Sequence, residues 1–145
     1  LVAKDKGVID SIRAHQGPYA FIMDAHTGSY RSSRVSDYFG LANRSRHMAN
    51  LAAFYSYEPW QLTANIRLHY RSKYGFTDKN NNRFIDAYDS FVAGHFLINM
   101  GLEKKLLNKH LAIQLHGDNL FNYTDRLMPG QAGRVLLMGV SYSFF

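Results

Sequence analysis

The sequence predicts an all-β protein of long antiparallel strands that cross a membrane as part of a β-barrel, and three observations carry this prediction. Apolar and polar residues alternate over long segments in the second half of the chain, as the side chains of a strand do. These segments run roughly 10 to 14 residues, above the ~5–6 residues of a strand in a soluble sheet and close to the ~9–11 of a tilted membrane strand. The connections alternate between short and long, which is typical of outer-membrane barrels with short periplasmic turns and long external loops.

The clearest alternation lies in residues 61–74. One face of this predicted strand is apolar and ends in tyrosines: Leu62, Ala64, Ile66, Leu68, Tyr70, Ser72 and Tyr74. The opposite face is polar throughout: Gln61, Thr63, Asn65, Arg67, His69, Arg71 and Lys73. A helix would mix the two sets, so the period of two indicates a strand.

The same pattern predicts four further strands, at residues 47–57, 90–102, 110–119 and 134–145. A short hairpin connection with a proline, Glu58–Trp60, separates the first of them from the strand at 61–74. We expect the apolar faces to contact lipid through Leu62, Ile66, Leu68, Phe96, Ile98, Leu136, Met138 and Val140. Aromatic residues near the strand ends match the girdles of membrane barrels: Tyr55, Tyr57, Trp60, Tyr70, Tyr74, Tyr142 and Phe144.

Residues 1–45 are predicted to form mostly one long extracellular loop, and residues 46–145 to supply about five transmembrane strands. Within the loop, residues 1–3 are expected to end a strand. Residues 4–15 are expected to form one or two helical turns, because Val8, Ile9 and Ile12 recur at helical spacing. Residues 19–25 and 29–35 are predicted to form a small hairpin whose turn contains Gly28, since glycine permits a positive φ.

Composition and residue spacing argue against several classes of site and function. The chain has 17 Lys+Arg against 11 Asp+Glu, a net charge of +6, and no cysteine, which excludes disulfides and thiolate metal sites. Nucleic-acid binding is not expected, because basic and aromatic residues lie on opposite faces of residues 61–74. Enzymatic activity is not expected either, since the spacing brings out neither a carboxylate pair nor a Ser/His/Asp grouping. The seven histidines lack metal-ligand spacing, although His69, His95 and His116 share the polar face.

Alternation alone does not say whether an apolar face points into a core or out to lipid. A soluble ligand-binding β-barrel of lipocalin-like type is therefore an alternative, as is a small structural outer-membrane barrel. Strand length, loop asymmetry and the basic opposite face favour the membrane. On that opposite face, a basic stripe of Arg67, His69, Arg71 and Lys73 is placed to steer an anionic ligand. The alternative is a hydrated wall whose cations pair with carboxylates of neighbouring strands.

Residues 78–89 match the spacing of an EF-hand calcium loop. The oxygen-bearing positions 1, 3, 5, 7, 9 and 12 are Asp78, Asn80, Asn82, Phe84 through its carbonyl, Asp86 and Asp89. Ile85 supplies the apolar residue that follows position 7. Arg83 departs from the pattern, because a glycine normally makes the sharp turn there, and an aspartate at the last position reaches less far than a glutamate. The spacing predicts calcium as a cofactor, and the alternative is a solvated Asn-rich loop.

Several motifs follow one another in the last third of the chain. They are Asp118-Asn119-Leu120-Phe121-Asn122-Tyr123, then Pro129-Gly130 and Gly133-Arg134, then Gly139-Val140-Ser141-Tyr142-Ser143-Phe144. With residues 43–50, which look like the start of a late strand, this combination resembles the C-terminal end of TonB-dependent outer-membrane receptors, particularly those of the Bacteroides group. The resemblance covers residues 43–145 well and the first 42 loosely. Two departures are Gln131-Ala132-Gly133, which separates Pro129-Gly130 from Arg134, and a final Phe145.

The resemblance implies the C-terminal segment of a barrel of about 22 strands with a plug in its lumen. Such receptors actively take up scarce nutrients, commonly ferric siderophores, haem or cobalamin, across the outer membrane of Gram-negative bacteria. The plug and the TonB box lie N-terminal in that family, so the chain is expected to be a portion of a longer receptor. The implied partners are the rest of that receptor, the TonB complex, outer-membrane lipid and the barrel assembly machinery, for which Tyr142 and Phe144 would form the recognition signal.

Overall fold

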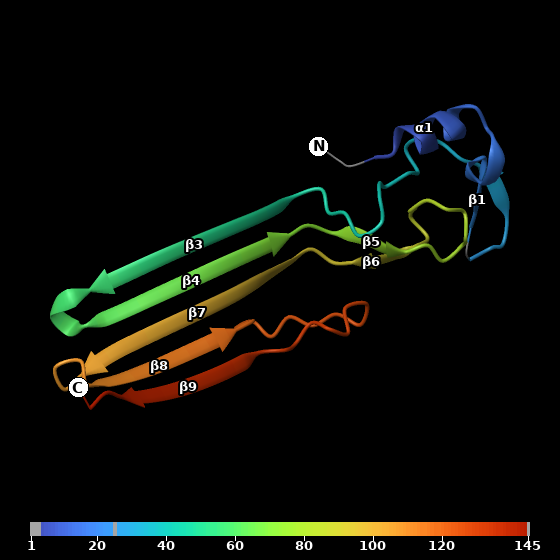
Figure 1. Ribbon diagram of the computed structural model, residues 1–145. Helices are drawn as coiled ribbons and strands as arrows, with labels where there is room; N and C mark the ends of the chain where they lie inside the picture. The colour runs from blue at the N-terminus through green and yellow to red at the C-terminus, as the bar shows by residue number, and fades with distance from the viewer. Residues whose placement is uncertain (1–3, 25, 145) are drawn as a thin grey trace. The chain divides into compact units, whose positions relative to one another are not determined.

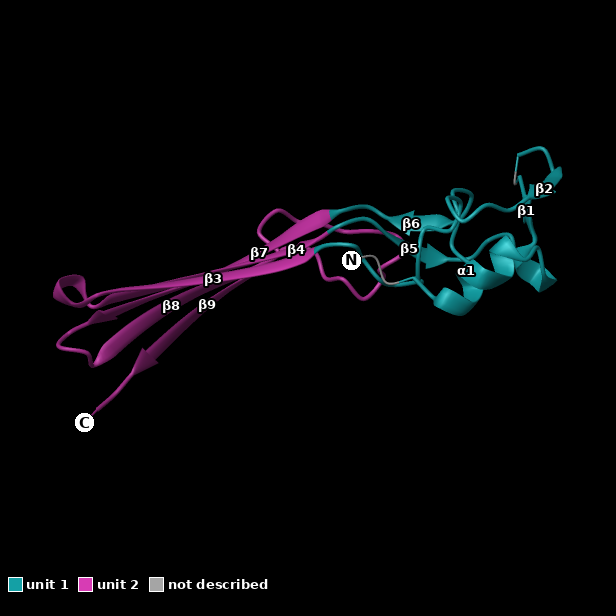
Figure 2. Cartoon of the chain, turned by 90° about the horizontal axis from the view of Figure 1, so that it is seen from above, with its two compact units in different colours: residues 1–47, 72–94 teal, residues 48–71, 95–145 magenta. Residues whose placement is uncertain are grey.

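The computed structural model describes residues 4–24 and 26–144, and antiparallel strands form most of its regular structure, which confirms the predicted all-β class. The chain divides into two units, coloured separately in Figure 2: unit 1 holds Leu1–His47 and Ser72–Gly94, and unit 2 holds Met48–Arg71 and His95–Phe145. Residues 72–94, which connect two predicted strands, belong with the first unit. Residues 1–3, for which a strand end is predicted, lie outside the described residues.

Unit 2 is one five-stranded antiparallel sheet with the order β3-β4-β7-β8-β9 (Figure 1). The strands are β3 Met48–Tyr57, β4 Leu62–Arg71, β7 His95–Leu106, β8 Leu111–Asp118 and β9 Val135–Tyr142. Each pairs with the next along the chain in this sheet. The five strands predicted from alternation are therefore all present and all neighbours.

The register keeps the two alternating sets of side chains on separate faces across the whole sheet. One row of directly opposed residues runs Tyr55, Ala64, Leu102, Leu115 and Met138. The adjacent row, on the other face, runs Ser56, Thr63, Glu103, Gln114 and Gly139. We call the face in register with Ile66 the apolar face and the face in register with Arg67 the polar face. A slip of one residue in any strand would move its whole apolar set to the polar face.

Short connections lie at one end of the sheet and long ones leave from the other (Figure 1). The 3-10 turn η2 (Glu58–Trp60) joins β3 to β4, and Gln61 closes it with a φ of 46°. Residues 107–110 join β7 to β8, where Leu107, Asn108 and Lys109 all have positive φ. At the opposite end, residues 72–94 and 119–134 form the long connections. The predicted asymmetry of the connections is confirmed.

Two predicted strands run past the points where the sheet ends. Tyr74 is predicted to end the second strand, yet β4 ends at Arg71 and Tyr74 begins β5 (Tyr74–Thr77) in unit 1. Ser90 is predicted to begin the third strand, yet it begins β6 (Ser90–Val92), which pairs with β5. Alternation continues through both breaks because it records side-chain direction and not the hydrogen-bonding partner. Tyr74 is 2% exposed, so it packs inside unit 1 and is not a girdle residue.

Unit 1 contains the helix and the hairpin predicted for the first part of the chain. They are α1 (Lys6–Arg13), the 3-10 turn η1 (Gly17–Tyr19), and β1 (Phe21–Met23) paired antiparallel with β2 (Tyr30–Ser32). The Asp5 carboxylate caps α1 by accepting from the Val8 N–H at 3.2 Å. A buried cluster joins these elements to residues 72–94: Ile12, Ile22, Tyr38 and Phe84. No helix within residues 4–24 and 26–144 is both long and apolar enough to cross a bilayer.

Asn119 holds together the base of the last long connection. Its buried side chain donates from Nδ2 to the carbonyls of Tyr123 at 2.8 Å and Ala132 at 2.9 Å, and its Oδ1 accepts from the Tyr123 N–H at 2.9 Å. Its own N–H donates to Asn99 Oδ1 on β7 at 3.0 Å. The backbone at Asn119 has a φ of 48°, which asparagine tolerates better than most residues. This residue of the Asn-Leu-Phe-Asn motif therefore fixes the path of the chain.

We expect Asn119→Gly to loosen the last connection. Glycine keeps the positive φ but removes three hydrogen bonds from a buried site, so the free energy of unfolding should fall by about 1–3 kcal/mol. Amide hydrogen exchange of residues 119–134 should rise accordingly. Asn108→Gly is the matched control, because Asn108 also has a positive φ, 51°, and its side chain makes no hydrogen bond within the described residues. Equal effects of both changes would contradict the proposed role of Asn119.

Candidate functional site

The apolar face of the sheet is exposed on every strand. Leu51 is 64% exposed, Ile66 42%, Phe96 50%, Leu115 47% and Met138 69%. The buried apolar side chains of the described residues all belong to unit 1. The eight residues predicted to contact lipid share this one exposed face. An apolar surface of this extent marks a face that meets a membrane or another protein.

Aromatic side chains lie at both ends of the apolar face. At the end with the short turns, the ring of Tyr57 lies 5.6 Å from that of Trp60, and the ring of Tyr142 lies 5.0 Å from that of Phe144. At the opposite end, Tyr70 on β4 packs against Phe96 on β7 with ring centroids 4.6 Å apart. Aliphatic rows fill the space between the two groups. This is the order of surfaces found on a membrane strand, with an aromatic girdle at each interface.

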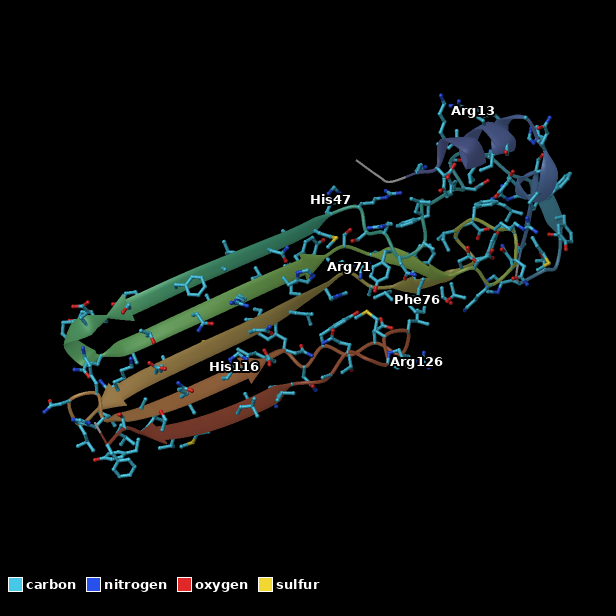
Figure 3. The ribbon with its side chains drawn as sticks, in the orientation of Figure 1. Arg13, His47, Arg71, Phe76, His116 and Arg126 are labelled. Carbon is cyan, nitrogen blue, oxygen red and sulfur yellow. The ribbon has the colours of Figure 1, made fainter. Side chains whose placement is uncertain are left out.

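Three residues of the predicted basic stripe share the polar face, and the fourth does not. Arg67, His69 and Arg71 alternate along β4, which ends at Arg71 (Figure 3). Lys73 follows in unit 1, where its Nζ lies 4.2 Å from the centre of the Phe91 ring. The stripe is therefore shorter than predicted, because the chain leaves the sheet before Lys73.

Carboxylates on the polar face are bound by residues outside the stripe. Glu103 accepts from Gln114 Nε2 at 2.7 Å and lies 3.4 Å from Lys105 Nζ. Asp118 lies 3.1 Å from Nε2 of His116, on the same strand (Figure 3). The side chain of Arg67 makes no hydrogen bond or ion pair within residues 4–24 and 26–144. The alternative of a wall in which this stripe is neutralised by neighbouring carboxylates does not describe Arg67.

The predicted calcium loop is closed around a buried carboxylate. Asp86, 1% exposed, accepts through Oδ2 from Nδ2 of Asn80 at 3.0 Å and of Asn82 at 2.7 Å, and through Oδ1 from the Tyr88 N–H at 2.8 Å. Three predicted calcium ligands therefore converge, but the two amides present nitrogen to Asp86. Within the described residues, no three His, Asp or Glu side chains gather as a metal site. Calcium stays a prediction, which requires both amides to turn their oxygens inward.

The predicted calcium loop makes its sharp turn at Arg83, although a glycine is usual there. Arg83 occupies the usual glycine position with a φ of 68°, and its N–H donates to Asp78 Oδ2 at 2.7 Å. Oδ1 of Asp78 is buried without a hydrogen-bond partner within the described residues. Asp89 accepts from the N–H groups of Lys79 and Asp86, both at 2.8 Å. Burial raises the pKa of Asp89, and the nearby charges of Asp86 and Asp78 act in the same direction.

Two features of the polar face could not be seen in the sequence. His95 stacks on Tyr123 with ring centroids 4.2 Å apart, which ties β7 to the last connection. Gly101 leaves room for the Asn65 side chain, whose Nδ2 would lie 2.5 Å from a Cβ at that position. Each feature joins residues from different elements of the chain. Alternation predicts the face on which a strand residue lies, not the residues that it contacts.

No protein-family model matches this chain, and neither a curated protein nor a solved structure matches it at a significant level.

We expect calcium to bind residues 78–89 with a dissociation constant of about 10⁻⁴–10⁻³ M, the range of extracellular modules. Isothermal titration of the full-length protein with calcium chloride measures this. Asp86→Asn and Asp78→Asn should each weaken binding, because each removes a charged ligand. Asp10→Asn is the control, since it removes the same charge from the exposed surface of α1 in the same unit.

The pH dependence of stability provides a second test of the predicted calcium site. Because burial raises the pKa of Asp89 above its unfolded value, its contribution to stability is present at acid pH and is lost as the pH rises through the folded pKa. Calcium should offset that loss by compensating the carboxylate charge. Thermal unfolding of unit 1, followed by near-ultraviolet circular dichroism at acid and neutral pH, compares the two states. A calcium effect identical at both pH values, or absent at neutral pH, would exclude the predicted site.

Proposed function

We propose that this chain forms part of the barrel wall of a TonB-dependent outer-membrane receptor, which takes up a scarce nutrient such as a ferric siderophore, haem or cobalamin. One observation carries the proposal: a continuous exposed apolar face spans all five strands and backs onto a polar face. A membrane barrel needs this arrangement, with lipid outside and a hydrated lumen inside. The C-terminal motifs that resemble this family support the same conclusion.

The height of the apolar face fits a bilayer. Along β4, eight residue steps separate Leu62, which is paired with Tyr57, from Tyr70, which packs on Phe96. At ~3.3 Å per residue this distance is about 26 Å, and a strand tilt of ~40° reduces it to about 20 Å. Membrane barrels carry an apolar band of ~25 Å between their aromatic girdles. The height between the aromatic rings at the two ends of the sheet is therefore comparable to that of this apolar band.

The connections support one orientation. Outer-membrane barrels have short turns toward the periplasm and long loops toward the outside. In this orientation η2 and residues 107–110 face the periplasm, whereas residues 72–94 and 119–134 lie outside the cell. The strand β9 then runs toward the periplasm, so Tyr142 and Phe144 end at the periplasmic side. That is where the barrel assembly machinery would meet them.

The free edges of the sheet imply partner strands. Within the described residues β3 pairs only with β4, and β9 pairs only with β8. Unpaired backbone groups are not tolerated in hydrocarbon, so five strands cannot cross a bilayer alone. We propose that the remaining strands and the plug belong to the rest of the receptor, through which the TonB complex would act.

Ile66→Arg tests the lipid contact. Ile66 lies in the middle of β4 on the apolar face, where an arginine should cost about 2–4 kcal/mol in a bilayer. We expect less protein in the outer-membrane fraction and loss of heat-modifiable migration on gels, measured on the full-length protein. Asn65→Arg is the control, because it places the same side chain at the same depth on the polar face, where Gly101 leaves room.

Three results would argue against the proposal in different ways. If both variants assembled equally well, the apolar face would not be in contact with lipid. A cooperatively folding monomer that is soluble without detergent would favour the lipocalin-like alternative. Membrane assembly of the chain without further strands would favour a small structural barrel.

The assembly signal has its own test. Tyr142 and Phe144 are both exposed and their rings are in contact at the end of the apolar face. If the assembly machinery recognises them, the double change Tyr142→Ala and Phe144→Ala should sharply reduce surface display, measured by antibody binding to intact cells. Leu136→Ala, an exposed apolar position at the far end of the same strand, is the control. Normal display of the double variant would leave these residues as girdle aromatics only.

A further inference from the structure

A groove on the polar face has Arg67 at its centre. The groove crosses β3, β4 and β7 and holds about 340 Å³. Its lining includes Asn50, Ala52, Arg67, His69, Leu97 and Asn99. The register explains the hollow, because the small Ala52 lies directly opposite Arg67 on one side and Asn99 on the other. The guanidinium is therefore exposed between two neighbouring strands.

We infer that this groove binds an oxyanion, a carboxylate or phosphate group, through Arg67. Both asparagine side-chain oxygens in the lining already accept a hydrogen bond. Asn50 Oδ1 is bound to His69 Nδ1, and Asn99 Oδ1 accepts from the Asn119 N–H at 3.0 Å. Both side-chain carbonyls are thus engaged, which leaves the two amide NH₂ groups to donate into the groove. The Arg67 cation and these two amide donors favour a ligand group that accepts hydrogen bonds.

Neighbouring carboxylates do not neutralise this cation. On the polar face, Glu103 is bound by Lys105 and Gln114, and Asp118 is bound by His116. Neither reaches Arg67 within hydrogen-bonding or ion-pair distance. The residues directly opposite Arg67 are an alanine and an asparagine, so no negative charge lies across the strand from it.

The side-chain type suits this ligand class. Arginine presents its donors in a planar fork that matches the two oxygens of a carboxylate or phosphate, and such bidentate pairs are stronger than neutral hydrogen bonds. Arg71 lies on the same face, four residues further along β4. We therefore assign a ligand with a carboxylate or phosphate group that is held by Arg67.

This inference rests on the proposed function only for the route by which the ligand arrives. In a receptor the polar face lines the lumen, and the oxyanion group would belong to the transported nutrient or its carrier. In a soluble barrel the same residues would still form the same site. Binding and membrane assembly can therefore be measured separately.

The experiment titrates the full-length protein with citrate and with inorganic phosphate at low salt, and with glucose as a neutral ligand. We expect saturable binding of at least one oxyanion and none of glucose. Arg67→Gln should weaken that binding about tenfold or more, since it removes a charge-assisted hydrogen-bond pair. Arg67→Lys should weaken it less, because it keeps the charge but loses the fork. The preferred ligand separates a carboxylate site from a phosphate site.

Lys105→Gln is the matched control. It removes one positive charge from the same face, but from a side chain already bound to Glu103. Equal weakening by Lys105→Gln and Arg67→Gln would overturn the inference, as it would indicate attraction by overall charge. Absence of any oxyanion binding that depends on Arg67 would overturn it as well. Arg67→Gln should leave membrane assembly intact, whereas Ile66→Arg should impair it, so failure of one proposal is distinguishable from failure of the other.

Discussion

Antiparallel pairing in a single register governs the behaviour of this sheet. Each strand alternates apolar and polar side chains, and pairing places residues of equal parity opposite each other from β3 to β9. The apolar sets therefore add up to one surface, and the polar sets to another. Because the period is two, no single strand can shift by one residue without placing its apolar side chains among polar neighbours. The chemistry of both faces follows from this constraint: Ile66 and Arg67 are adjacent in sequence, yet one belongs to a surface that needs an apolar environment and the other to a hydrated wall.

The two units obtain their stability in different ways. Unit 1 buries Ile12, Ile22 and Phe84 in a small core, so apolar burial holds its helix and short strands together. Within the described residues the sheet of unit 2 has no such core, and many side chains on its apolar face remain largely exposed. The backbone hydrogen bonds between neighbouring strands hold this sheet together, whereas much of its apolar surface is exposed. A sheet of this kind is well suited to lipid, which supplies the apolar environment that the chain itself does not.

The sequence was sufficient for those features that depend on local periodicity and insufficient for those that depend on distant contacts. The strands around Ile66 and Met138 follow from alternation, and α1 follows from the spacing of its apolar residues. The breaks at Lys73 and before His95 do not, because alternation persists where the hydrogen-bonding partner changes. Spacing alone identified the oxygens of residues 78–89. It could not reveal that Asn80 and Asn82 donate to Asp86, because an amide can offer either end to its neighbour. The Asn119 hydrogen bonds likewise join positions up to 20 residues apart.

The edges of the sheet lead to the same conclusion in water and in lipid. Along β3 and β9, one row of backbone groups has no partner strand within the described residues. In hydrocarbon each unsatisfied group costs several kcal/mol, so the sheet must continue until it closes. In water the same edges, next to an exposed apolar face, would promote pairing with further strands. Short, charged or proline-containing edges usually prevent this, but β9 carries neither charge nor proline. Within the described residues, nothing in the sequence of β9 protects its free edge from pairing with a further strand.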